Sequence, residues 1–325
     1  MTSETRNPRP PLPLPEIAIF VALAYVLGWL VYLPALITGA PPEGPMYSVS
    51  AILMMFTPTL AALVCLLWFV RPRGGILRDL AMTPLRPWGR LSRYLLAAVL
   101  VMPLLGLVAA LVAASMGVVV LDLEGFSGLR DRADAEPGTG VPVGLILTFV
   151  LTTMAGMVTA IPIFVGEELG WRGYLLPRLV PLGVWPALIF CGVIQGLWHG
   201  PQLLIRLVDG VDDLAQTGVF LGTCVLFGIV AGWLRLASGS VWPAVLAHAG
   251  FTTVFLGFFV LGDVDTPTDG LLYGGGTTGL IGLAVTAALV VVLAVTGRMR
   301  GLRAYREDAG VEAPGPQAGA ENPDQ

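Results

Sequence analysis

The sequence has no lysine, only two histidines and three cysteines, and few charged residues, which make up 12% of its 325 positions. The cysteines lie far apart in apolar stretches without CxxC spacing, so neither a disulfide framework nor a cysteine-based zinc or redox site is indicated. The net charge of −4 and the pI near 5.2 argue against nucleic-acid binding. Apolar residues make up 55% of the chain and the mean hydropathy is +0.80, which excludes an ordinary soluble domain.

Long apolar stretches recur along the chain. A helix needs about 20 apolar residues to cross the roughly 30 Å of bilayer hydrocarbon. Eight windows qualify, at 16–37, 49–70, 94–118, 146–177, 184–205, 217–236, 241–261 and 276–297. The fourth exceeds one crossing, so we expect it to tilt or to begin at the interface. The sequence therefore predicts an all-α, polytopic membrane bundle of about eight transmembrane helices, without internal repeats or a soluble domain.

The arginines indicate the orientation, because loops on the cytoplasmic side carry the excess of positive charge. One side of the predicted spans holds fifteen of the 18 arginines: Arg6, Arg9, Arg71, Arg73, Arg78, Arg86, Arg90, Arg93, Arg172, Arg178, Arg235, Arg298, Arg300, Arg303 and Arg306. The opposite loops are acidic and contain only Arg130, Arg132 and Arg206. We therefore expect a multi-pass protein of the cell membrane with both termini in the cytoplasm.

Polar tails flank the predicted membrane domain at 16–300. Residues 1–15 are rich in proline, and residues 301–325 are rich in Gly, Ala, Pro and acidic groups. Neither composition can bury a core, so both are predicted to be disordered cytoplasmic tails. The first apolar stretch is too long for a secretory signal and is expected to be a retained span.

Two adjacent glutamates, Glu167 and Glu168, interrupt the fourth apolar window. An unpaired charge in hydrocarbon costs at least ~2.5 kcal/mol, so such residues usually face a cavity, a partner or a reaction. Glu168 and Arg172 share a helix face four residues apart, the spacing of an ion pair. Glu167 projects ~100° away and is free to act as a general base. The alternative is a structural salt bridge with Glu167 at the interface.

The two histidines also lie in apolar windows. His199 shares a helix face with Gln195, and the neighbouring Gly196 and Gly200 allow a helix or a substrate to approach closely. His248 shares a face with Thr252, and hydrogen-bond donors at these positions could stabilise an oxyanion. A satisfied core histidine at 199 and an interhelical polar clamp at 248 are the alternatives.

Together these residues resemble the CPBP family of intramembrane proteases, relatives of the type II CAAX prenyl endopeptidases. The family's glutamate pair followed by three residues and arginine is matched by Glu167, Glu168 and Arg172. Its second motif is matched at His199, with Gln195 in place of the usual phenylalanine. Its third motif is matched at His248, followed by Thr252 where asparagine or another small residue is usual. The likeness covers about 146–255, which is the family's catalytic core.

The resemblance implies an intramembrane endopeptidase. Glu167 and His199 would activate a water molecule, and His248 with Thr252 would stabilise the oxyanion. Glu168 and Arg172 would organise the site, which we expect to open toward the cytoplasmic half of the membrane. The substrate would be a peptide or a membrane-protein end, prenylated or not, in contact with membrane lipids.

The family is commonly described as metalloproteases, which raises the question of zinc. Glu167, His199 and His248 could hold Zn²⁺ and leave a fourth position for water. The His-Glu-x-x-His arrangement of soluble metalloproteases is absent, and a metal-free glutamate mechanism fits the residues equally well.

Two further classes compete with the enzyme. Intramembrane Glu and His also mark proton relays in transporters, and a chain with this fold could be a non-proteolytic immunity or scaffold factor. The paired glutamates in register with arginine, and the lack of an inverted repeat of broken helices, favour the enzyme. Proton-coupled uptake into liposomes without proteolysis would favour transport.

Gly228 and Gly232 form a GxxxG pair, which predicts close helix packing within one chain or between two.

Overall fold

The computed structural model describes residues 11–42, 44–257, 259–274, 278–299 and 302, with backbone alone for 253–257 and 259. In these ranges the chain is helical, and extended backbone pairs only at an isolated bridge between Leu121 and Gly262. The predicted disordered tails at 1–15 and 301–325 lie outside these ranges except for residues 11–15 and 302, and the first helix already begins at Leu14. The predicted all-α class is confirmed.

Helices of very different length follow one another along the chain. The main helices are α1 (Leu14–Thr38), α2 (Pro45–Met54), α3 (Thr57–Val64), α5 (Trp88–Ser115), α7 (Val143–Glu168), α9 (Val184–Trp198), α10 (Gly200–Val208), α11 (Leu214–Ser238), α12 (Trp242–Gly257) and α13 (Gly279–Val295). The short helices are α4 (Ile76–Asp79), α6 (Ser127–Arg132) and α8 (Leu176–Leu179). Two π-helical segments, η1 (Cys65–Val70) and η2 (Leu169–Leu175), and two 3-10 turns, η3 (Val180–Leu182) and η4 (Phe259–Leu261), complete the chain.

The eight predicted windows all form helices, but they differ in length. Five continuous helical stretches among the described residues are long and apolar enough to cross a membrane: Leu14–Thr38, Pro45–Val70, Trp88–Ser115, Val143–Leu182 and Leu214–Ser238. Helices α9 and α10 make a sixth if they count as one span bent by 49°. Helix α12 has 16 residues and α13 has 17, so both are shorter than these stretches. The polytopic bundle is therefore confirmed, whereas the count of eight spans is not.

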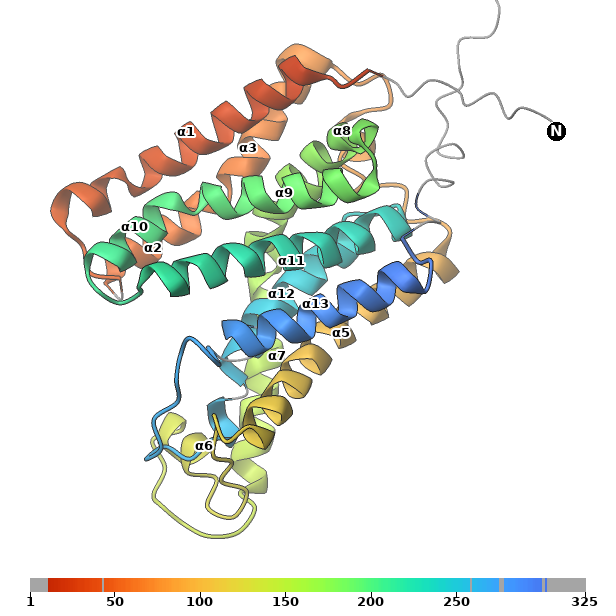
Figure 1. Ribbon diagram of the computed structural model, residues 1–325. Coiled ribbons are helices and arrows are strands. Elements are labelled where there is room, and N and C mark those ends of the chain that lie inside the picture. The colour runs from red at the N-terminus through yellow and green to blue at the C-terminus, as the bar shows by residue number, and fades with distance from the viewer. Residues whose placement is uncertain (1–10, 43, 258, 275–277, 300–301, 303–325) are drawn as a thin grey trace, which may run out of the picture.

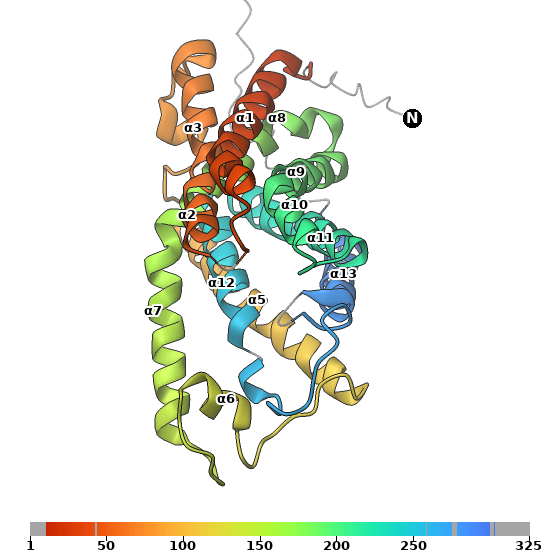
Figure 2. The same cartoon turned by 90° about the vertical axis from the view of Figure 1, so that its left-hand side faces the viewer.

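The helices form a bundle in which one long helix runs across the others. Helices α1, α9 and α11 lie side by side, with α9 packed on α11, and α7 crosses behind them (Figure 1). Helix α12 is held between α5 and α7 (Figure 2). The fourth predicted window is indeed longer than one crossing, since the helix continues from Val143 to Leu182.

The two ends of the bundle differ in charge. At one end Arg178 pairs with Glu16 at 2.9 Å and with Asp79 at 3.2 Å, and the indole of Trp242 donates to the Met82 carbonyl. The start of α1 and the end of α13 also lie there (Figure 1). We call this the arginine-rich end, because the predicted arginine-rich connections meet at it.

The opposite end is built from acidic connections. Asp122 accepts hydrogen bonds from the backbone N–H groups of Gly125 and Ser127 at 2.7 and 2.9 Å, which shapes the turn before α6. Helix α6 packs on η4, and the Ser127 hydroxyl accepts from the N–H of Val264. This acid-rich end is the one that holds Arg130, Arg132 and Arg206.

Glycines allow helices to touch at the centre of the bundle. A Cβ on Gly228 would lie 2.8 Å from the Cα of Gly192, and one on Gly232 would lie 2.3 Å from a methyl of Leu188. The GxxxG pair therefore packs α11 against α9 within one chain. Gly196 likewise faces Cys224 of α11, so the close approach expected at this glycine is made by a neighbouring helix.

Gly170 offers a test of this packing. Its hypothetical Cβ would lie 2.4 Å from the Cβ of Pro58 and 2.6 Å from the Pro58 carbonyl carbon. We expect Gly170→Ala to lower the free energy of unfolding by about 1–3 kcal/mol, because α3 must move to relieve the overlap. Gly156→Ala is the control, because it meets nothing within 4 Å and gains helix propensity. Denaturant titration in detergent measures both, and equal stabilities for the two variants would contradict the packing account.

Candidate active site

The glutamate pair sits where α7 passes into the π-helical segment η2. Both side chains are buried, with 1% of Glu167 and none of Glu168 exposed. Gly166 and Gly170 on either side let the backbone of α2 and α3 approach, since a Cβ on Gly166 would lie 2.8 Å from the Met55 carbonyl. The local sequence therefore brings two carboxylates into the protein interior.

Glu168 joins two helices through one carboxylate oxygen. Its Oε1 accepts from the Arg172 guanidinium at 2.8 Å, as the four-residue spacing predicts. The same oxygen lies 2.8 Å from Nδ1 of His248 on α12, 80 residues away in the sequence. Glu168 thus fixes both the arginine and the orientation of the histidine ring, and the predicted pair is extended to a third residue.

Glu167 is held through its other neighbours. Its Oε2 accepts from the indole N–H of Trp171 at 3.3 Å and from the amide of Gln195 at 3.1 Å. Among the described residues, none donates a hydrogen bond to the other carboxylate oxygen, Oε1. Trp171 was missed in the sequence, although it also lies four residues after a glutamate. Glu167 is therefore positioned by one oxygen and keeps a second for chemistry.

His199 lies at the break between α9 and α10. Pro201 has no N–H to donate to the Leu197 carbonyl, and the His199 N–H bonds to Gly196, three residues back. The Gln195 carbonyl is therefore left for Nδ1 of His199, at 2.9 Å. Because a carbonyl only accepts, Nδ1 carries the proton and Nε2 keeps its lone pair in the neutral ring.

Helix α1 braces this break. The Trp29 indole donates to the Trp198 carbonyl at 3.1 Å, and the Trp198 indole donates to the Ala24 carbonyl at 3.2 Å. The Tyr25 hydroxyl donates to the Ile194 carbonyl at 2.6 Å. These bonds satisfy backbone groups near the bend, which would otherwise be costly in an apolar setting.

Aromatic rings surround His248. Its ring lies 4.5 Å from that of Phe164 and 4.8 Å from that of Phe227, between centroids. The Arg172 guanidinium carbon also lies 5.3 Å from the Phe227 centroid. The two phenylalanines were missed in the sequence, because nothing distinguishes them there from the other apolar residues. Thr252 uses its hydroxyl to contact the His248 carbonyl of its own helix at 3.4 Å.

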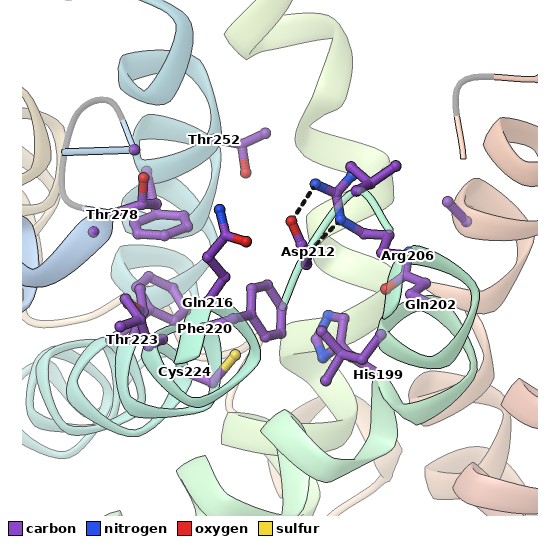
Figure 3. A pocket seen from close by; sticks show the side chains of 18 of the residues that line it. His199, Gln202, Arg206, Asp212, Gln216, Phe220, Thr223, Cys224, Thr252 and Thr278 are labelled. Carbon is purple, nitrogen blue, oxygen red and sulfur yellow. Dashed lines mark hydrogen bonds and ion pairs between the residues drawn. The ribbon is translucent and has the colours of Figure 1, made fainter. Parts of the chain in front are cut away.

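A cavity of about 700 Å³ connects these groups. Glu167, His199, His248 and Thr252 all border it, together with Gln195. His199 and Phe220 point into the same space, and Thr252 lies across it on α12 (Figure 3). Glu168 and Arg172 are not among the lining residues and stand behind His248. The structure thus places four of the six candidate residues around one space and the other two in support.

The described residues do not fit a metal site. No group of three or more His, Cys, Asp or Glu side chains among them could hold an ion. Glu167, His199 and His248 all border the cavity. The zinc site at Glu167, His199 and His248 stays a prediction.

The part of the chain that builds this site matches a known protein family. Residues 148–254 match the profile of a family described as Type II CAAX prenyl endopeptidase Rce1-like. This range nearly coincides with 146–255, where the motifs show the resemblance, so the resemblance is confirmed over that part of the chain. No curated protein matches the chain.

Gln195 links the two reacting groups and yields a prediction. Its side-chain N–H donates to Glu167, and its main-chain carbonyl accepts from His199. Its side-chain oxygen, Oε1, is buried without a partner among the described residues. A hydrogen bond to a charged group contributes about 1.5–3 kcal/mol, so Gln195→Leu should lower kcat by about 10- to 100-fold with little change in KM. Gln202→Leu, which changes the same cavity farther from Glu167, is the control in a peptide-cleavage assay. Equal rates for both variants would contradict the role of Gln195.

Proposed function

We propose that the chain is an intramembrane endopeptidase that hydrolyses a peptide bond with water activated by Glu167. The observation that carries this proposal is the convergence of Glu167, His199 and His248 on one cavity. Glu167 is held through Oε2, and His199 and His248 are each held through Nδ1. The second oxygen or nitrogen of each side chain therefore remains for the reaction. The match to the Rce1-like family over 148–254 supports the same class.

The water is placed between two acceptors. Glu167 offers Oε1, and His199 offers the lone pair on Nε2 because Nδ1 is bound to Gln195. Water held by both attacks the peptide carbonyl as Glu167 takes its proton. The carbon–nitrogen bond then breaks as Glu167 passes that proton to the leaving amine. A positioned general base of this kind contributes typically 10²–10⁴-fold.

His248 supplies the oxyanion donor. Its Nδ1–H donates to Oε1 of Glu168, which orients the ring. In the form of the ring that also carries a proton on Nε2, this second N–H donates to the carbonyl oxygen as charge develops on it. Arg172 balances the charge of Glu168 on the side away from the cavity. Thr252 borders the reaction space and contributes shape there.

The chain is a multi-pass membrane protein, and the arginine asymmetry supports an orientation with both termini in the cytoplasm. The substrate is a peptide or a membrane-protein end.

The proposal is tested by comparing membrane proteomes of cells that contain the wild type or the Glu167→Gln variant. An uncleaved species should accumulate with the variant, and the same species should be shortened with the wild type. Identical protein termini in the two membranes, at equal expression, would refute proteolysis by this site.

A further inference from the structure

The active-site cavity extends toward one end of the bundle. From His199 its lining continues along α10 to Arg206, and from Thr252 across to the connection that contains Thr268. Asp212 of the α10–α11 connection also lines it, bound to Arg206 at 2.6 and 2.9 Å (Figure 3). These connections belong to the acid-rich end.

The cavity does not continue toward the arginine-rich end. In the described part of the chain, its lining includes no residue of the connection 71–93, of α8 or of the turn 239–241. Between Glu167 and the arginine-rich end, the chain places four side chains that are not exposed at all: Trp171, Tyr174, Leu175 and Leu176. A solid core therefore separates the carboxylate from the arginine-rich end.

The charge asymmetry assigns these ends to sides of the membrane. Positive charge marks the cytoplasmic side, and the arginine-rich end also carries the start of α1 and the end of α13. The acid-rich end, with the mouth of the cavity, then faces the other compartment. This differs from the expectation that the site opens toward the cytoplasmic half of the membrane, because the packing of buried side chains, which the sequence does not reveal, closes the cavity on that side.

We propose that the cavity is a blind entry from the extracytoplasmic side, and that its substrate is the end of a polypeptide presented from that side. This inference rests on the proposed function. The mouth carries polar groups on Arg206, Asp212 and Gln216, whereas the interior carries Phe220 and Phe227. A chain end with a few apolar residues followed by polar ones fits this order.

The depth of the cavity sets how far the scissile bond lies from the mouth. Arg206 follows His199 by seven residues, which on a helix corresponds to about 10 Å. An extended peptide covers that distance with about three residues. The scissile bond therefore lies about three residues inside the mouth, and the chain end beyond it must fit within the closed part of the cavity.

Cysteine labelling in intact cells tests the direction of entry. In a background with Cys65, Cys191 and Cys224 changed to alanine, Thr268→Cys places a thiol at the mouth and Arg93→Cys places one at the arginine-rich end. A membrane-impermeant maleimide should label Thr268→Cys in intact cells, and should label Arg93→Cys only after the membrane is permeabilised. The reverse pattern would overturn the inference, whether or not the protein cleaves anything.

A second readout concerns entry itself. With the substrate nominated by the proteome comparison, a bulky maleimide on Thr268→Cys should reduce cleavage at least tenfold, while the same label on Arg93→Cys in permeabilised membranes should leave it unchanged. Full cleavage by labelled Thr268→Cys would overturn entry through this mouth. Absence of cleavage even before labelling, with the predicted labelling pattern intact, would count against the proposed function and not against the orientation.

Discussion

Purified Glu167→Gln protein should lose roughly 10²–10⁴-fold in kcat for peptide cleavage while it keeps the stability of the wild type. Glutamine has the shape of glutamate, and its carbonyl oxygen can still accept from Trp171 and Gln195, which hold Oε2 in the wild type. Only the capacity to take a proton from water is removed. The measurement is kcat and KM in detergent with the substrate found in membranes.

The control for this variant is Glu16→Gln. Glu16 is paired with Arg178 at the arginine-rich end and does not border the cavity, so its substitution should leave kcat within about twofold. Undiminished turnover by Glu167→Gln would remove the general base from the mechanism. Equal losses in both variants would show that a lost charge, and not the reacting group, explains the effect.

Arg172→Met should be the most destabilising single substitution of a charged residue among those discussed, lowering the free energy of unfolding by roughly 3–5 kcal/mol. Both members of its pair with Glu168 are fully buried, so the variant leaves a carboxylate without its cation. His248 still contacts that carboxylate, but the guanidinium also packs near Phe227. Denaturant titration in detergent, followed by far-UV circular dichroism, gives the value.

Two comparisons make this prediction specific. Arg206→Met breaks a partly exposed pair with Asp212 and should cost about 0–1 kcal/mol. The double variant Glu168→Gln and Arg172→Met removes both charges and should recover part of the loss. A loss for Arg172→Met no larger than that for Arg206→Met would contradict the account of a buried, coupled pair.

Local spacing predicted much of this site. The pairing of Glu168 with Arg172 follows from helix geometry alone, because four residues bring side chains onto one face whatever the fold. The same rule, applied to Glu167, would have found Trp171. The apolar windows predicted the helices for a similar reason, since a bilayer-spanning length depends only on the local run of residues.

Contacts across the bundle could not be predicted in this way. The bond between Glu168 and His248 joins residues 80 positions apart, and it depends on how α12 packs against α7. The break at His199 has a local signal in Pro201, yet the direction of the bend is set by α1, through Trp29 and Tyr25. The end toward which the cavity opens depends in turn on where the buried core lies, which no single helix reveals.

The central claim is that water activated at Glu167 cuts a peptide bond, and isotope transfer tests it most directly. Protein reconstituted in vesicles is supplied with its substrate in H₂¹⁸O, and the newly formed carboxyl terminus is examined by mass spectrometry. The account predicts one heavy oxygen in that terminus with the wild type and no product with Glu167→Gln. A product without heavy oxygen, or the same labelled product from the variant, would contradict it.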